Sequence, residues 1–313
     1  MDDFPLAFRW TVPVRTIRLT GSDARRFLHG QSSQAIESGS HGSCLATCLI
    51  TPTARMRGLA LVQLEPELVK LIVISGDAEA IHRALDQVLF PADRVSLEQP
   101  QAARLVRFCG APTGTLSRDG PHRSHWLEPG VNLGAGSDQP ALLLPPEADL
   151  PAWLEALPEL TGPQAERWRI RQGFPAVPAE ANEHTNPFEL GLASWVSLSK
   201  GCYVGQETLA KLATYHGVKQ QLRHWRLVGG AVDLPQGGLE PGETLLSPGG
   251  ERAGVITSSL GDGHQAEGLA LVRRQALDQT VLLTTDQREL SISTPPAFVD
   301  PPTGPGGPPA AQP

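Results

Sequence analysis

Cys202 is the residue of this sequence best suited to chemistry. It lies in the run SKGCYVGQET, residues 199–208, just before a stretch whose apolar residues follow helical spacing. The glycines on either side, Gly201 and Gly205, permit positive φ and close backbone approach. The positive end of the following helix and the ammonium group of Lys200 would both favour a thiolate over a thiol. The pattern suits a metal-binding, redox or nucleophilic cysteine, and a structural cysteine in a tight turn is the alternative.

The sequence offers Cys202 no evident partner. His184 and His216 are the nearest histidines along the chain, and neither forms a recognisable signature with it. A second cysteine at zinc-ligand spacing is also missing. Cys44 and Cys48 lie on one expected strand, roughly 13 Å apart, which suits buried hydrophobic side chains better than a shared metal.

The elements that must position this loop show two patterns. Residues 12–98 alternate expected strands with short helices, and residues 102–172 repeat the mixture less clearly, which indicates an α+β fold. Residues 112–140 are rich in Gly, Pro and Ser and are predicted to be loop. From about residue 222, short strands separated by Gly, Pro and Asp predict a small antiparallel barrel.

Length, composition and charge exclude several classes of protein. The chain has 313 residues, of which 40% are hydrophobic and 19% charged, enough for about two domains with a sizeable core. No apolar run approaches the ~20 residues that a membrane span needs. The acidic start, MDDFP, does not resemble a signal peptide, so we expect a cytoplasmic protein. The net charge of −7, without a Lys/Arg run, argues against strong direct nucleic-acid binding.

Residues 200–207, KGCYVGQE, resemble the K-G-C-[YF]-x-G-Q-E signature of the YgfZ family. Members of that family are folate-binding proteins related to the aminomethyltransferase, or T-protein, of the glycine cleavage system. Further segments resemble the family in the expected order: residues 19–31, 49–55, 169–175 and 254–258. Together the matching segments span about residues 14–275, nearly everything outside the Pro-rich C-terminus.

This resemblance implies an α+β, T-protein-like folate-binding body of two related halves, followed by a C-terminal antiparallel β-barrel. The body is expected over residues 1–217, with halves of about 1–100 and 101–217, and the barrel over residues 218–293. Residues 294–313 contain eight prolines and no periodicity, so we predict a disordered tail there.

The resemblance also implies a site. Cys202 is the expected functional centre, with Lys200 beside it. Among the other signature residues, Gly201 and Gly205 are expected to act through their backbone and Tyr203 through packing. Gln206 and Glu207 are expected to cap the following helix. No metal site is certain. Cys202 could supply one transient iron ligand or a site of redox exchange, with the remaining ligands coming from a partner protein.

Bound folate would need a flat apolar slot for the pterin and cations for its glutamate tail. Trp168 is the candidate for the slot, with core packing as the alternative, and Arg55, Arg57 and Arg169 are candidates for the tail. In the T-protein, the turn after the second strand carries an acidic pair required for aminomethyl transfer. The matching stretch here, residues 54–59, contains no acid, which argues against that reaction.

The function that the resemblance implies is that of a tetrahydrofolate-binding accessory factor. Such a protein would assist the assembly or repair of iron–sulfur enzymes, including those that methylthiolate tRNA, rather than act as a stand-alone catalyst. Its expected partners are folate and iron–sulfur proteins, with no membrane. Two alternatives are a folate-dependent one-carbon (aminomethyl) transferase and a non-catalytic folate scaffold, whose folate binding would be indifferent to loss of Cys202.

Overall fold

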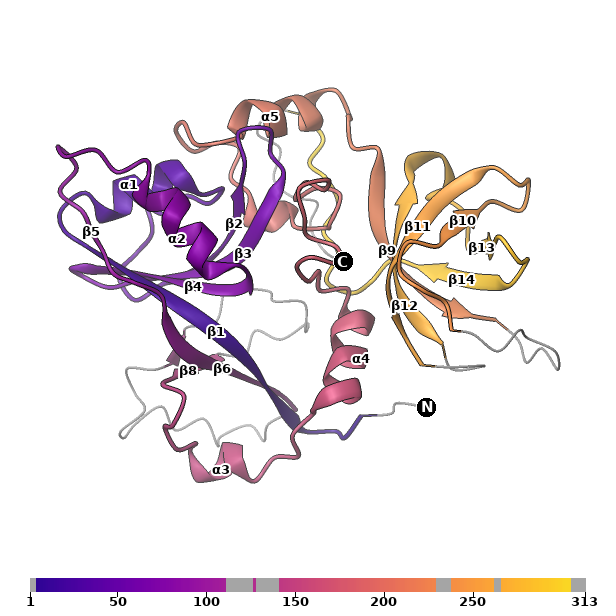
Figure 1. Cartoon of the computed structure of the whole chain (residues 1–313), viewed down its shortest axis with the longest axis horizontal. Helices are drawn as coiled ribbons and strands as arrows, with labels where there is room; N and C mark the ends of the chain where they lie inside the picture. The colour runs from indigo at the N-terminus through magenta and orange to yellow at the C-terminus, as the bar shows by residue number, and fades with distance from the viewer. Residues whose placement is uncertain (1–3, 111–125, 128–140, 229–237, 262–265, 305–313) are drawn as a thin grey trace.

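A twisted sheet and a closed barrel, with one helix between them, form the framework of the chain (Figure 1). The computed structural model describes residues 4–110, 126–127, 141–228, 238–261 and 266–304. Over these residues the sheet has eight strands, and the barrel is closed by six antiparallel ones. The predicted α+β class with a C-terminal antiparallel barrel is therefore confirmed.

β1 (Phe8–Thr20) is the strand that joins the two ends of the sheet. Its C-terminal part pairs with β4 (Leu68–Gly76), and its N-terminal part pairs with β6 (Gln101–Cys109). One long strand therefore runs through both expected halves of the body. The remaining strands of the sheet are β2 (Cys44–Ile50), β3 (Met56–Leu64), β5 (Ser96–Leu97), β7 (Trp126–Leu127) and β8 (Ala141–Leu144).

Two helices, α1 (Ala24–Gln31) and α2 (Ala78–Asp86), cover one face of this sheet (Figure 1). Their apolar residues, at helical spacing, join a buried cluster with side chains of β1, β3 and β4. Asp77 accepts a hydrogen bond from the Ala80 N–H at 3.0 Å and so satisfies one free donor at the start of α2.

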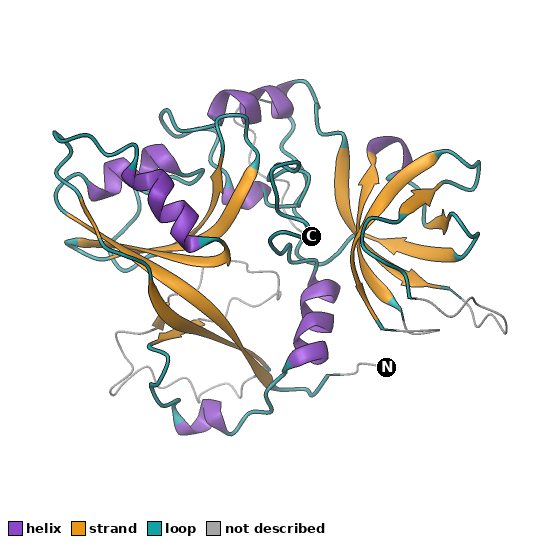
Figure 2. Ribbon diagram, viewed as in Figure 1, coloured by secondary structure: helices purple, strands orange, loops and turns teal. Residues whose placement is uncertain are grey.

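α4 (Gly162–Gln172) lies between the sheet and the barrel (Figure 1). It has a proline in its first turn and ends at Gly173, whose φ is 73°, as the sequence pattern predicts. Residues 173–205 have little regular structure (Figure 2) and lead to α5 (Gln206–Thr214). Two further helices are short, α3 (Ala152–Glu155) and the 3-10 helix η2 (Ala193–Trp195). Across the described ranges, no helix has the length and hydrophobicity needed to cross a bilayer.

The barrel is packed around Trp225, which has no exposed surface. Its Nε1 donates to the Leu269 carbonyl at 3.2 Å, which satisfies the buried indole N–H. A Cβ at Gly268 would lie 2.6 Å from the indole ring, so only glycine permits this packing. The barrel strands are β9 (Gln220–Leu227), β10 (Thr244–Leu246), β11 (Arg252–Leu260), β12 (Glu267–Arg273), β13 (Val281–Thr284) and β14 (Glu289–Ser293), with a 3-10 helix, η4 (Arg274–Ala276), after β12.

The first part of the segment predicted to be a disordered tail is packed against the body. Phe298 and Val299 are buried, and the Val299 N–H donates to the Gly191 carbonyl at 2.9 Å. A Cβ at Gly191 would lie 2.3 Å from the Phe298 ring, so the ring lies directly on that glycine. For residues 294–304 the prediction of disorder is wrong, because two apolar anchors outweigh the proline-rich composition. Residues 305–313 lie outside the described residues, as does the predicted loop 112–140 except for β7.

Candidate functional site

The signature loop, residues 199–205, is held by the turn that follows α1. Lys200 Nζ donates hydrogen bonds to the carbonyl oxygens of His29, Ser32 (2.7 Å) and Gln34 (2.9 Å). Carbonyl groups at the C-terminal end of a helix lack backbone hydrogen-bond donors, and the buried ammonium of Lys200 donates to three such groups here. It also lies 4.3 Å from the centre of the Tyr203 ring. Burial lowers the pKa of Lys200 to about 7, while the carbonyl acceptors favour its charged form.

These contacts differ from the role predicted for Lys200. The sequence suggests that its charge stabilises a thiolate at Cys202, whereas its ammonium is engaged by the turn after α1. Two backbone hydrogen bonds also attach the loop to this turn. The Val204 N–H donates to the Gly30 carbonyl at 3.1 Å, and the Ser197 N–H donates to the Ser33 carbonyl at 2.8 Å. Lys200 therefore fixes the loop, and Cys202 is left exposed on it.

Gly205 lets the loop approach the turn between β2 and β3. Its φ is 81°, and a Cβ there would lie 2.7 Å from the Thr51 carbonyl oxygen and 2.8 Å from the Ile50 side chain. Glycine is required at this position both for its conformation and for its size. Gly201 does not adopt positive φ, and a Cβ there would meet no atom closer than 3.9 Å.

The remaining signature side chains support the loop in different ways. Tyr203 is buried, as predicted, and its hydroxyl has no hydrogen-bond partner among the described residues. Gln206 Nε2 donates to the Lys200 carbonyl at 3.2 Å, and exposed Glu207 pairs with Lys211 at 2.7 Å. Neither Gln206 nor Glu207 caps α5, because its N-cap is Gly205 and no side chain bonds there. The prediction that they cap the helix is wrong.

His29 is the histidine beside this loop, and sequence proximity does not reveal it. Its Nε2 would lie 3.9 Å from a Cβ on Gly201, the residue before Cys202. Its Nδ1 accepts a hydrogen bond from the Glu37 N–H at 3.2 Å. Burial and the nearby charge of Lys200 lower the pKa of His29. The only sequence signal was indirect, since His29 belongs to the opening helix that resembles the YgfZ family.

Metal-binding geometry is not built into the described part of the chain. No three His, Cys, Asp or Glu side chains within it gather closely enough to hold a metal ion. Cys44 and Cys48 are free and buried in β2, and burial raises the pKa of each thiol, to about 12 for Cys44. They are structural, as predicted. Cys202 differs from them because it is exposed.

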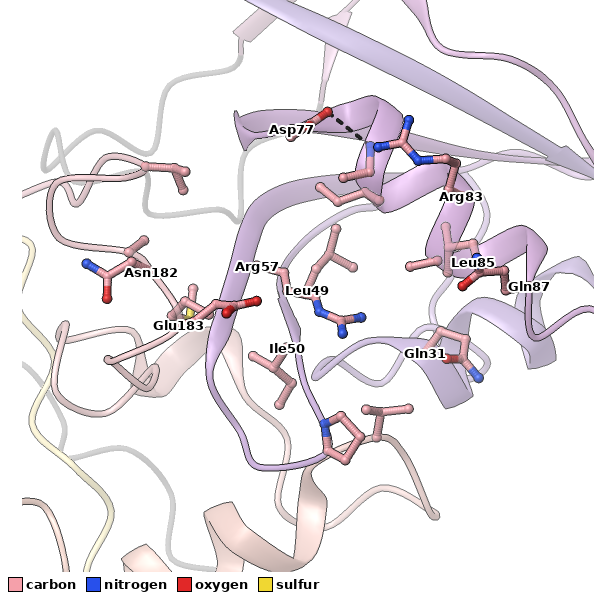
Figure 3. Close-up of a pocket in the computed structure, with 18 of the residues that line it drawn as sticks. Gln31, Leu49, Ile50, Arg57, Asp77, Arg83, Leu85, Gln87, Asn182 and Glu183 are labelled. Carbon is pink, nitrogen blue, oxygen red and sulfur yellow. Dashed lines mark hydrogen bonds between the residues drawn. The ribbon is translucent and has the colours of Figure 1, made fainter.

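A groove of about 750 Å³ borders the signature loop at Val204 (Figure 3). It runs between α2, the ends of β2 and β3, and residues 177–183, and the side chain of Arg57 extends into it. Arg55, the other arginine of that turn, donates to the His184 carbonyl at 2.8 Å and does not line the groove. Of these two candidates for contact with the glutamate tail, Arg57 therefore extends into the groove and Arg55 does not.

A second cavity, of about 360 Å³, lies between α4 and the strands β1 and β6. We call it the tryptophan cavity, because Trp10 and Trp168 both line it. Trp168 also packs edge-on against Phe8, with ring centres 4.9 Å apart, so it lines the cavity and belongs to an aromatic cluster at once, and its predicted contact with folate stays a prediction. Arg107 lines the same cavity, 4.9 Å from the Trp10 ring centre, and burial lowers its pKa to about 9. Sequence reasoning missed Trp10 and Arg107, which lie on strands.

Arg169 lines the tryptophan cavity but is already neutralised. It forms ion pairs with Glu166 (2.7 Å) and Glu180 (3.1 Å) and donates to Ser258 Oγ of the barrel at 2.8 Å. Glu180 is fully buried and accepts a second bond from Ser258 at 2.5 Å. A buried carboxylate needs such partners, so Arg169 fixes α4 against the barrel. Of the predicted folate contacts, the structure brings Trp168 and Arg169 to one cavity and leaves Arg55 outside it.

Comparison with known proteins finds several relatives of similar sequence. No family model matches the chain. It is 31% identical to the chloroplastic At1g60990 protein of Arabidopsis thaliana, whose name suggests a transferase, over 83% of this chain and 63% of that protein. It is 29% identical to the tRNA-modifying protein YgfZ of Vibrio vulnificus, over 82% of this chain and 76% of the relative. The mitochondrial iron–sulfur cluster assembly factor IBA57 of Mus musculus is 30% identical over 41% of this chain and 35% of that protein.

The fold has a match among solved structures. The aminomethyltransferase T of the glycine cleavage system from Bartonella henselae superposes with a TM-score of 0.72, covering 95% of this chain and 88% of that one. Sequence identity over the match is 16%, so the likeness concerns the fold. The aligned part of the chain spans less than two thirds of the Arabidopsis and mouse relatives.

Proposed function

The chain belongs to the family that includes the YgfZ and IBA57 proteins, and on this premise we propose that it is a tetrahydrofolate-binding accessory protein for iron–sulfur enzymes. It assists the assembly or repair of their clusters, and the enzymes that methylthiolate tRNA are among its clients. The observation that carries this proposal is the exposed thiol of Cys202 on a loop fixed to α1 and to the turn between β2 and β3. A thiol so placed is accessible to a partner while its backbone stays in one conformation.

The tryptophan cavity supports the folate part of the proposal. Its indole rings and neighbouring apolar side chains provide flat walls of the kind that a pterin needs. Arg107 supplies a cation at that wall, and its low-dielectric surroundings strengthen any contact with a carboxylate or carbonyl group. Bound folate would itself carry the one-carbon group. Trp10, Trp168 and Arg107 would line the part of the cavity that holds the folate, and Arg169 is engaged by two carboxylates.

Iron–sulfur clusters enter this proposal as cargo. The described residues hold no set of three metal-ligating side chains, so Cys202 contributes a single sulfur ligand and the client contributes the others. An exposed ligand suits transfer, because a buried site would have to open before the cluster could leave.

A one-carbon transferase is supported less well. The position Gly58, in the stretch that corresponds to the acidic pair of the T-protein, packs against α2, where an added Cβ would lie 2.9 Å from the Ile81 side chain. No acid is present there to assist amine chemistry. The predicted cytoplasmic location stays a prediction, since two of the relatives are named as chloroplastic and mitochondrial.

The test measures methylthiolated adenosine in tRNA by mass spectrometry, in an organism that makes this nucleoside and encodes the chain. We compare the wild type, a deletion strain and a chromosomal Cys202→Ala strain. Cys109→Ala is the matched control, because Cys109 is free and only half-buried but lies on β6. The proposal expects the nucleoside to fall in the deletion and Cys202→Ala strains and to be unchanged in Cys109→Ala. An unchanged level in the deletion strain would contradict it, and a fall in the deletion strain alone would favour a folate scaffold.

A further inference from the structure

The groove of about 750 Å³ beside the signature loop has two walls that are held by contacts within the chain. We call it the α2 groove, because α2 forms one wall. That helix lies close on β3, where a Cβ at Gly58 would be 2.9 Å from the Ile81 side chain. In the opposite wall, residues 177–183, Asn182 Nδ2 donates to the Pro178 carbonyl at 3.0 Å. The α2 groove is therefore preformed, as binding sites usually are.

Most of the side chains that line the α2 groove are apolar. Leu49 at the end of β2 and Ile81 and Leu85 of α2 are among them. Val88, which follows α2, also lines the groove and is 40% exposed, and Phe90, two residues further along, is 72% exposed. Large apolar side chains that are exposed beside an apolar groove are typical of a surface that another molecule covers.

Charged side chains of both signs line the same groove without partners. Arg57, Arg83 and Glu183 all line it (Figure 3), and within the described part of the chain none of them forms an ion pair or a side-chain hydrogen bond. Arg55, in the same turn as Arg57, is by contrast engaged by the His184 carbonyl at 2.8 Å. Charges placed in this way favour a partner whose own charges are complementary.

We propose that the α2 groove binds an extended segment of another protein. The segment presents an acidic side chain to Arg57 and Arg83, apolar side chains to the lining and a basic side chain to Glu183. An apolar centre with a charged rim is the usual anatomy of a protein interface. The inference goes beyond the proposed function and does not rest on it, because neither the tryptophan cavity nor Cys202 takes part.

The amide side chains of the groove and its length favour a peptide over a small metabolite. Gln31 and Gln87 line the groove, and their amide groups make no hydrogen bond among the described residues. Each amide offers a donor and an acceptor, which suits the N–H and C=O groups of a peptide backbone. The nine residues of α2 span about 13 Å, the length of about four residues in extended conformation.

The test begins with a library of random peptides displayed on phage and selected against the full chain. We expect the enriched peptides to carry an acidic residue among apolar ones, and selection against Arg57→Glu to lose that acidic residue. The most enriched peptide is then synthesised, and its Kd is measured by fluorescence anisotropy. Arg57→Glu should raise the Kd at least about tenfold, because like charges meet. Ala84→Gln, which places a longer side chain in the groove, should raise it by a similar factor.

Arg252→Glu is the matched control for the charge reversal. Arg252 is an exposed arginine at the start of β11, as Arg57 is near the start of β3, and its side chain has no partner within the described ranges. The peptide should bind this variant with the wild-type Kd. Arg57 is exposed and makes no side-chain contact of this kind either, so Arg57→Glu should fold normally, which urea unfolding checks.

Three results would overturn the proposal. The first is that selection enriches no peptide of the acidic and apolar kind. The second is a wild-type Kd in both Arg57→Glu and Ala84→Gln, and the third is displacement of the peptide by tetrahydrofolate, which would assign the groove to a small molecule. Peptide binding requires neither folate nor Cys202. An unchanged tRNA in the deletion strain would therefore refute the proposed function and leave this inference standing.

Discussion

Replacing Lys200 by Met tests how the signature loop is held. Methionine keeps most of the apolar stem and removes the ammonium that binds three carbonyl groups. Ser32 is completely buried, so its carbonyl would be left without water or partner. His29 and Gln34 are only partly buried, and water can replace the lost bond at each.

The magnitude follows from these three acceptors. A buried acceptor without a partner costs about 1–3 kcal/mol, and a partly exposed one about 0.5–1 kcal/mol. The contact of the ammonium with the Tyr203 ring, at 4.3 Å, adds about 0.5–1 kcal/mol. We therefore expect Lys200→Met to lower the free energy of unfolding by about 2.5–6 kcal/mol.

The assay is equilibrium unfolding in urea, followed by tryptophan fluorescence, with hydrogen exchange at the Val204 amide as a local measurement. That amide donates to the Gly30 carbonyl at 3.1 Å, so its exchange should become faster when the loop loosens. Lys211→Met is the matched control, because it removes an exposed lysine whose pairing with Glu207 is screened by solvent and contributes little to stability. If Lys200→Met cost no more than Lys211→Met and left Val204 exchange unchanged, the assignment of Lys200 as the anchor of the loop would be refuted.

Three further predictions concern Gly205, Glu267 and the tryptophan cavity. Gly205→Ala should lower the free energy of unfolding, measured in urea, by at least about 2 kcal/mol, because backbone strain and a 2.7 Å clash combine. Gly250 is the control: its φ is 83° but the space around it is open, so Gly250→Ala should cost about 1 kcal/mol. Burial would raise the pKa of Glu267, but hydrogen bonds from the His224 and Arg171 side chains hold it at about 2, so the stability it contributes is present above pH 4.5 and is lost as the pH falls toward 2. Thermal unfolding against pH should show this loss in the wild type and a flatter curve in Glu267→Gln. Trp168→Ala should weaken tetrahydrofolate binding about tenfold in calorimetric titration, while Arg55→Ala, outside the cavity, should leave it unchanged. Equal affinities in the wild type, Trp168→Ala and Arg55→Ala would contradict the assignment of the cavity.

Sequence alone was sufficient for features encoded in adjacent residues. The signature loop could be located before α5 because the motif is contiguous and its glycines mark a tight turn, whereas the functional role of Cys202 stays a prediction. The ends of α4 were predicted for the same reason, since the proline of its first turn and Gly173 act on their own stretch of chain. Barrel strands were found from short apolar runs and turn residues.

Features that depend on distant residues were decided by the tertiary structure. Lys200 was expected beside the thiol, yet its charge is used by carbonyl groups of residues 29–34, which the docking of α1 brings to the loop. Arg169 was expected to be available to a ligand, yet Glu180 and Ser258 engage it once α4 packs on the barrel. The composition of the C-terminal segment concealed Phe298, whose partner is a glycine more than a hundred residues away.

The physical reason is the range over which each interaction acts. Backbone preferences, capping and periodicity involve neighbours within a few residues, so they can be inferred from a short window of sequence. The charge states of Lys200 and His29, and the accessibility of Cys202, depend on burial and on partners that lie far apart along the chain. Those are set only when β1 aligns both ends of the sheet and α4 joins the sheet to the barrel.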